Sequence, residues 1–205
     1  DYHSLALQED GRVAAWGINW SGQTDVPPEL TNAMTVAAGG SHSVAVDANG
    51  RVVAWGANEY GQTNMPAGLT NAVAVAAGES HSLALRADGR VIAWGYNGYG
   101  QTTVPAGLTN AVAVAAGRNH SMALCADGRV VAWGRNNNGQ TNVPAGLSNM
   151  VAVAAGGDHS LALVHTLALV VASEHGTPTP GRGTNVVLPG TLQRCWVDPA
   201  EGWTQ

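Results

Sequence analysis

Apolar and polar positions alternate in short runs along most of the chain. An alternation of two is typical of β-strands, whose successive side chains point to opposite faces of a sheet. In one unit the strands are predicted over residues 73–77, 81–86 and 90–94. Asp88-Gly89 between the last two runs predicts a hairpin with a type I′ turn, which needs a positive φ at both central positions. Pro105 argues against a central strand in residues 104–110, which are expected to form a crossing connection or a short edge.

The whole unit recurs with a period of 39 residues. Its histidines lie at His3, His42, His81, His120 and His159, and its tryptophans at Trp16, Trp55, Trp94 and Trp133. A helical repeat is disfavoured because the period of two dominates and helix caps are missing. Repeated units of short strands at this spacing predict a β-propeller or a β-solenoid.

The repeated pattern AAGxxHSxALxxDGRVxAWGxNxxGQ resembles the repeat of the regulator of chromosome condensation family, which forms seven-bladed β-propellers. The short unit with GQTxVP is most similar to the bacterial type found in β-lactamase inhibitory protein of the second type. The resemblance implies an all-β propeller over residues 1–163, with 39-residue blades of mainly three strands. The chain has five segments of the HSxAL type, one of which reads HSVAV, and four WG segments, so four to five blades are expected. That number predicts an incomplete ring, a smaller closed ring, or a ring closed by another chain.

The period stops at residue 164, and residues 164–205 form a second segment rich in Pro, Thr and Gly. This tail is similar to the opening of a bacterial surface β-sandwich module. A segment of this length cannot easily bury a core of its own. It is therefore expected to pack on the propeller or on a neighbour. The chain begins inside a repeat and no signal peptide opens it, which predicts a processed or truncated sequence.

Composition excludes several classes of partner and reaction. The net charge is −5, every basic residue is Arg, and no basic cluster occurs, so nucleic acid is not expected to bind. No apolar run of membrane-spanning length is present, so membrane insertion is not expected. The motifs GxSxG and HExxH and a phosphate-cradling Gly motif are missing, which argues against an enzyme. No cofactor is expected, and two Cys do not form a disulfide framework.

The repeated His-Ser pair does not predict a catalytic site. His81 and Ser82 are neighbours on one strand, so their side chains point to opposite faces. No Cys or carboxylate recurs at a fixed offset from the histidines, so a metal site is not expected either. We instead expect buried histidines that tie each blade to the next, and buried indoles that set the packing between blades. The structural positions of the repeat are His42, His81, His120, His159, Trp16, Trp55, Trp94 and Trp133.

The positions that differ from unit to unit follow AAG and WG. Strand direction places both segments at one end of every blade, which we call the varied face. The Asp-Gly turns, or Asn49-Gly50 in one unit, lie at the other end, which we call the constant face. Trp, Tyr and Arg are enriched at the energetic centres of protein interfaces. Neutral drift of surface loops is the alternative interpretation. The candidate partner-binding residues are Trp20, Glu59, Tyr60, Glu79, Tyr96, Tyr99, Arg118, Asn119, Arg135, Asn137 and Asp158.

These observations favour a non-enzymatic, extracellular or cell-surface bacterial module that binds a protein, or alternatively a glycan, on its varied face. Inhibition of a β-lactamase is one concrete form that the resemblance implies. The alternative is a structural element of a surface protein that self-associates through open strand edges. Nucleotide exchange on a small GTPase is disfavoured because kinship of fold does not carry function.

Overall fold

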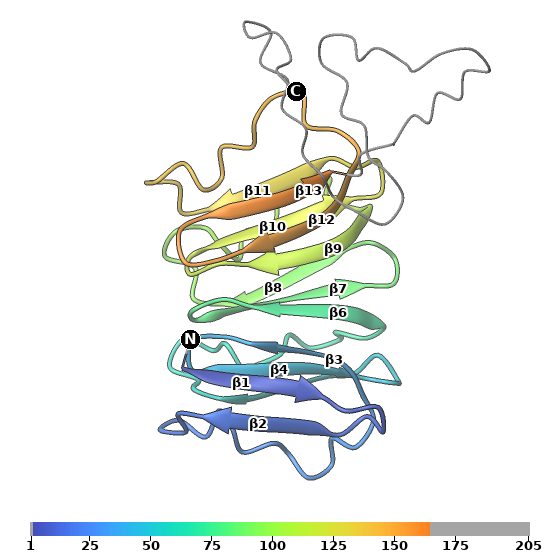
Figure 1. The fold of residues 1–205 in the computed structure, drawn as a ribbon, viewed down its shortest axis with the longest axis vertical. Helices are drawn as coiled ribbons and strands as arrows, with labels where there is room; N and C mark the ends of the chain where they lie inside the picture. The colour runs from blue at the N-terminus through green and yellow to red at the C-terminus, as the bar shows by residue number, and fades with distance from the viewer. Residues whose placement is uncertain (1, 165–205) are drawn as a thin grey trace, which may run out of the picture. The chain divides into compact units, whose positions relative to one another are not determined.

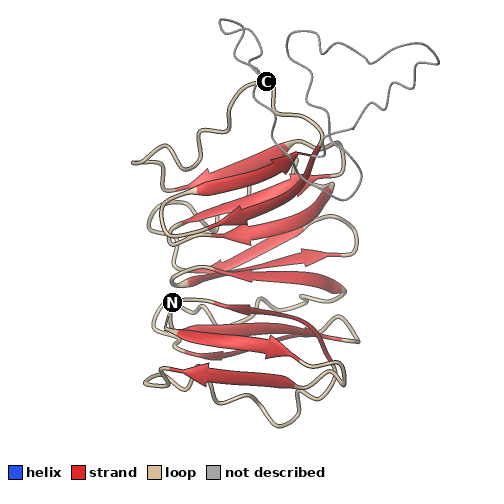
Figure 2. Cartoon of the chain, viewed as in Figure 1, coloured by secondary structure: helices blue, strands red, loops and turns tan. Residues whose placement is uncertain are grey.

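The structure, a computed structural model, describes residues 2–164, and these are built from strands without helices (Figure 2). The chain divides into two units, Asp1–Val164 and His165–Gln205. The predicted tail domain therefore lies outside the described residues, apart from Val164. Within residues 2–164 no helix has the length and apolarity needed to cross a bilayer.

Three complete blades form the centre of this unit, and each is an antiparallel sheet of three consecutive strands. A two-stranded sheet precedes them and another follows them (Figure 1). The sheets are β1 (His3–Leu7) with β2 (Val13–Gly17); β3 (Ala33–Ala38), β4 (His42–Asp47) and β5 (Val52–Gly56); β6 (Ala72–Ala77), β7 (His81–Arg86) and β8 (Val91–Gly95); β9 (Ala111–Ala116), β10 (His120–Cys125) and β11 (Val130–Gly134); and β12 (Met150–Ala155) with β13 (Ser160–Val164).

The predicted fold class, an all-β propeller with blades of three strands, is confirmed. The expected strands agree with β6, β7 and β8 to within one residue, and residues 96–110 contain no strand. The first strand of each blade contacts the first strand of the next, from β3 to β6, β9 and β12. Within the described part, no sheet hydrogen bond joins β1 or β2 to β12 or β13.

The predicted type I′ turn at Asp88-Gly89 is wrong. Gly89 has a φ of 77°, but Asp88 has no positive φ. The amide of Gly89 donates to the carbonyl of Arg86 at 2.9 Å, which closes a β-turn whose central residues precede the glycine. This is a longer hairpin loop in which a β-turn is followed by one left-handed glycine. Asn49-Gly50 follows the same course, with a positive φ only at Gly50.

The core lies between blades rather than inside any one of them. One cluster joins Leu83 and Leu85 of β7 to Ala123, Cys125 and Trp133 of the next blade. Equivalent clusters join the other neighbouring pairs of sheets. Each blade therefore buries its apolar faces against its two neighbours, as expected where a repeat cannot form a core alone.

Candidate partner-binding face

The two ends of every blade differ in the structure as they do in the sequence. His42 pairs with Gly56 across β4 and β5. The loop that enters β4 and the loop that leaves β5 therefore emerge together on the varied face. The hairpin between the same two strands lies at the opposite end, on the constant face.

A chain of buried hydrogen bonds ties each blade to the next. His81 Nε2 lies 3.0 Å from Ser121 Oγ in the following blade, and makes no hydrogen bond to its neighbour Ser82. Ser121 Oγ donates to the carbonyl of Gln101 at 2.8 Å, and Trp133 Nε1 donates to the same carbonyl at 2.9 Å. The equivalent imidazole–hydroxyl contacts are His3–Ser43, His42–Ser82 and His120–Ser160.

This geometry fixes the protonation of the histidines. The single proton of Ser121 Oγ goes to a carbonyl, so His81 Nε2 must be the donor in the other bond. His81 Nδ1 is then the unprotonated nitrogen, and it is buried without a hydrogen-bond partner among the described residues. Burial lowers the pKa of His42 to about 4 and that of His81 to about 3, with a contribution from neighbouring imidazoles. The side chains of His42 and His81 are therefore neutral at neutral pH.

The glycine of AAG is required by these ties. A Cβ on Gly39 would lie 2.5 Å from His42 Cε1 and 2.6 Å from the carbonyl oxygen of Gly78 in the next blade. The same crowding recurs at Gly78 and Gly117, whereas a Cβ on Gly156 would meet only His159. Gly39 therefore leaves room for the imidazole and lets adjacent blades approach closely.

Repeated glutamines connect the ties to the varied loops, and sequence reasoning assigned them no role. Gln101 accepts the Ser121 and Trp133 bonds through its backbone, while its side-chain Oε1 accepts a bond from the amide of Tyr99 at 3.0 Å. Asn97 Oδ1 accepts from the amide of Thr102 at 2.9 Å, which closes the same loop. The only signal for this role was the recurrence of GQ after WGxNxx. Constant residues thus hold in place the loops on which the varied residues stand.

Five of the predicted residues form one continuous line across four blades. The rings of Tyr60 and Tyr96 lie 4.9 Å apart between centroids, and those of Tyr96 and Tyr99 lie 6.1 Å apart, both edge to face. The guanidinium of Arg135 lies 5.5 Å from the centroid of Tyr99. Arg135 also pairs with Asp158 at 3.6 Å. Tyr60 and Tyr99 are exposed, whereas Tyr96 and Arg135 are half-buried between them and their neighbours. We call this set the tyrosine line.

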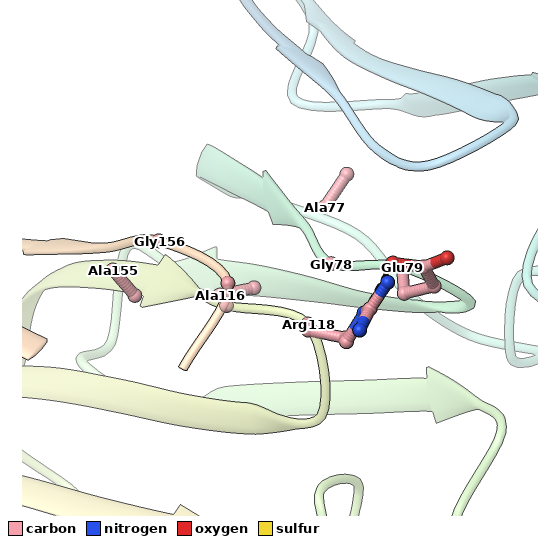
Figure 3. A pocket seen from close by; sticks show the side chains of 9 residues that line it. Ala77, Gly78, Glu79, Ala116, Arg118, Ala155 and Gly156 are labelled. Carbon is pink, nitrogen blue, oxygen red and sulfur yellow. Dashed lines mark hydrogen bonds and ion pairs between the residues drawn. The ribbon is translucent and has the colours of Figure 1, made fainter. Parts of the chain in front are cut away.

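A second group lies nearer the inner strands. Arg118 and Glu79 of the preceding blade form an exposed ion pair at 3.1 Å. Figure 3 shows their side chains pointing toward each other. The pair lies beside a hollow of about 220 Å³. Glycines and alanines at the ends of β6, β9 and β12 line the rest of this hollow. An exposed pair of this kind adds little stability, but it marks the rim of the hollow with both signs of charge.

The remaining predicted residues belong to neither the tyrosine line nor the group around Arg118 and Glu79. Trp20, Glu59 and Asn137 are exposed on the varied loops and make no aromatic contact or ion pair within residues 2–164. Asn119 accepts a hydrogen bond from Gln101 Nε2 at 3.3 Å, and so supports a loop. In the described part of the chain, no group of three or more His, Cys, Asp or Glu side chains is placed to hold a metal ion.

Comparison with known proteins identifies the repeat. Residues 35–62, 72–101 and 111–140 match the Regulator of chromosome condensation (RCC1) repeat. No curated protein matches the sequence.

Solved structures share the fold. A chain in the crystal structure of Kap60 bound to yeast RCC1 (Prp20) is 25% identical with a TM-score of 0.64, and the match covers 80% of this chain and 52% of that one. Human WBSCR16 is 26% identical with a TM-score of 0.68, covering 80% and 56%. The CRINKLY WD40 ectodomain of the Arabidopsis thaliana receptor kinase ACR4 is 21% identical with a TM-score of 0.65, covering 82% and 60%, and shows likeness of fold alone. The chain thus spans a little over half the length of these proteins.

Proposed function

We propose that this chain, an RCC1-like repeat propeller, is a non-enzymatic binding module whose partner is a protein docked on the varied face. The observation that carries the proposal is the tyrosine line, in which Tyr60, Tyr96, Tyr99 and Arg135 touch in sequence across three blades. None of these side chains belongs to the repeated pattern. The repeat therefore does not require them, whereas a partner that spans several blades would use them together.

The chemistry of the line suits a protein partner. Aromatic side chains supply large contact areas with few rotatable bonds, and Tyr and Arg often dominate binding energy. The loop that carries Tyr96 and Tyr99 is already held by Gln101 and Asn97, so little ordering of it would be needed on binding. Arg135 is positioned by both Tyr99 and Asp158, and its half-buried side chain stays partly accessible beside the exposed ring of Tyr99. That a yeast protein of this fold is seen bound to Kap60 is compatible with the proposal.

Two variants, one on each face, test whether the protein partner binds the varied face. Wild-type chain, the Tyr60→Ala/Tyr99→Ala variant and the Arg90→Ala variant are immobilised and exposed to extract and culture medium of the encoding organism. Arg90 is exposed beside the turn of the constant face, so it is the matched control. We expect a protein that is retained by wild type and by Arg90→Ala, and retained at least roughly tenfold less by the double variant. Equal retention by all three proteins, or loss with Arg90→Ala alone, would contradict the proposal.

An extracellular bacterial inhibitor of a β-lactamase is the concrete form that the 39-residue unit suggests. The rate at which a purified β-lactamase hydrolyses a chromogenic cephalosporin, measured against increasing chain, tests it. Saturable inhibition that the Tyr60→Ala/Tyr99→Ala variant weakens would support this form. An unchanged rate at excess chain would exclude it for that enzyme while leaving the broader proposal to the capture experiment.

A glycan is the alternative partner, and its sugar rings would stack on the exposed tyrosines. A glycan array probed with the wild-type chain and with the Tyr60→Ala/Tyr99→Ala variant tests this alternative.

A further inference from the structure

A glycine of the varied face lies against the central ring of the tyrosine line. Gly98 follows Tyr96 by two residues in the loop between β8 and β9. A Cβ on Gly98 would collide with the hydroxyl oxygen of Tyr96 and would lie 2.5 Å from Cζ of the same ring. Real Cβ atoms do not make contacts as close as these. The ring of Tyr96 therefore occupies the space that a side chain at position 98 would need.

The backbone of this loop does not itself require a glycine at position 98. Gly98 has no positive φ, so a residue with a Cβ can adopt the same conformation. The equivalent loops are closed by the same bond from a backbone amide to a glutamine side chain. They carry larger residues at this position, namely Trp20, Glu59 and Asn137. The contact with Tyr96 is thus the feature that distinguishes Gly98 from its counterparts.

The sequence links the two residues as well. Among the four loops that follow WG, only one has an aromatic ring at the position of Tyr96, and only that loop has a glycine at the position of Gly98. The residues at the position of Tyr96 in the other three loops are Ile18, Ala57 and Arg135. The combination of a ring at position 96 and no side chain at position 98 therefore belongs to one blade and not to the repeat.

Tyr96 is the ring that joins the tyrosine line. It contacts Tyr60 of the preceding blade at 4.9 Å between centroids and Tyr99 of its own loop at 6.1 Å, both edge to face. No direct ring contact joins Tyr60 to Tyr99 within residues 2–164. Movement of the Tyr96 ring away from Gly98 would therefore divide the line between the two blades.

We propose that Gly98 is the positioning residue of the tyrosine line. Because it has no side chain, the ring of Tyr96 lies against its own loop, between Tyr60 and Tyr99. The three rings are thereby held as one surface before a partner arrives, which limits the ordering that binding would require. The consequence for binding rests on the proposed function, whereas the position of the ring does not depend on any partner.

Gly98→Ala separates this role from the stability of the fold. The heavy atoms nearest to the added methyl group belong to the far end of the Tyr96 side chain, which can rotate away. Gly95 at the start of the same loop provides a contrast, because a Cβ there would lie 2.7 Å from the backbone carbonyl oxygen of Ser80. We therefore expect Gly98→Ala to unfold at a denaturant concentration close to that of wild type, with Tyr96 displaced from both ring contacts.

Tyrosine ring signals in NMR spectra test the position of Tyr96 without a partner. The full chain has four tyrosines, so isotope-labelled tyrosine gives few signals, which single Tyr→Phe variants assign. We expect nuclear Overhauser effects between the rings of Tyr96 and Tyr60 in wild type and in Asn137→Ala, a control at the same repeat position of the next blade. Gly98→Ala should lose this effect and shift the ring signals of Tyr96. A ring contact that persists in Gly98→Ala, or that is missing from wild type, would overturn the proposal.

Retention of a protein partner then tests the consequence for binding. Wild type, Gly98→Ala, Tyr96→Ala and the double variant are immobilised and exposed to the same extract and culture medium as above. We expect Gly98→Ala to retain at least roughly fivefold less of the partner than wild type. In the Tyr96→Ala background, Gly98→Ala should cause no further loss, because it acts through that ring.

Two results of this experiment would overturn the positioning role. One is a further loss when Gly98→Ala is added to Tyr96→Ala. The other is full retention by Gly98→Ala while Tyr60→Ala/Tyr99→Ala loses the partner. Equal retention by all of these variants would instead contradict the proposed function, and the ring contacts alone would then decide the role of Gly98.

Discussion

At the residue scale, the serine that pairs with the histidine of the preceding blade has the strictest chemical requirement in the repeat, because it must accept one hydrogen bond and donate another. Ser121 accepts from His81 and donates to the carbonyl of Gln101. Sequence reasoning could show that His81 and Ser82 point apart, because that follows from the geometry of a single strand. It could not identify Ser121 as the partner, because that contact depends on how one blade is stacked on the next.

Ser121→Ala should destabilise the chain by about 1–3 kcal/mol, because it leaves the buried N–H of His81 without an acceptor, while the carbonyl of Gln101 keeps its bond from Trp133. Ser4→Ala is the matched control, since Ser4 occupies the same repeat position but is exposed. That variant should change the free energy of unfolding by less than about 0.5 kcal/mol. Urea unfolding followed by tryptophan fluorescence measures both. Equal effects of the two substitutions would show that the tie between blades is not what stabilises this position.

At the element scale, the strands were easier to predict than the turns that join them. The alternating pattern located the strands to within one residue because a period of two is a local property. The turn before them was predicted with the wrong type. An Asp-Gly pair suits a type I′ turn, but it also suits the last two positions of a longer loop with one left-handed glycine. Only the bond from the amide of Gly89 to Arg86 distinguishes the two.

Trp94→Ala should cost on the order of 3–5 kcal/mol, because the buried indole fills the space between two blades and its removal leaves a cavity. Trp16→Ala should cost less than about 1 kcal/mol, since the Trp16 side chain is 54% exposed. The two tryptophans occupy the same repeat position and differ in their burial. Thermal unfolding compares the two variants directly. A loss for Trp16→Ala as large as that for Trp94→Ala would contradict this account of the buried indole.

At the scale of the whole molecule, the repeated ties make stability depend on pH. The folded state holds His42 and His81 neutral, with pKa values of about 4 and about 3, below the ordinary value of 6.5. Above pH 6.5 the imidazoles are neutral in both states, and the full stability is present. As pH falls below 6.5 the unfolded chain binds protons that the folded chain does not, so stability declines until the folded pKa values are reached.

Each such histidine contributes a slope of about 1.4 kcal/mol per pH unit within that window. Chemical denaturation at intervals between pH 7 and pH 4 should therefore show stability falling steadily below pH 6.5. His81→Gln should reduce the slope, because it removes one titrating group from the set. A stability that stays constant between pH 6.5 and pH 4 would contradict the account of neutral buried ties.

The sequence predicted which residues lie on the candidate site, but not which of them contact one another. Tyr60, Tyr96, Tyr99 and Arg135 were predicted as separate members of a varied face, because strand direction alone places them at one end of the blades. Their contact as one line could not be predicted, since it depends on the spacing between neighbouring blades. Trp20 and Glu59 met the same sequence criterion and lie outside the line.

The most direct test of the central claim is site-specific photo-crosslinking from the two ends of a blade. A photoreactive amino acid is placed at position 60 on the varied face, or at position 90 on the constant face, in otherwise wild-type chain. After exposure to the encoding organism's extract and medium, illumination should yield a discrete heavier adduct with a second protein from position 60 and none from position 90. An adduct from position 90 alone, or adducts of equal yield from both positions, would contradict the claim that the varied face is the binding face.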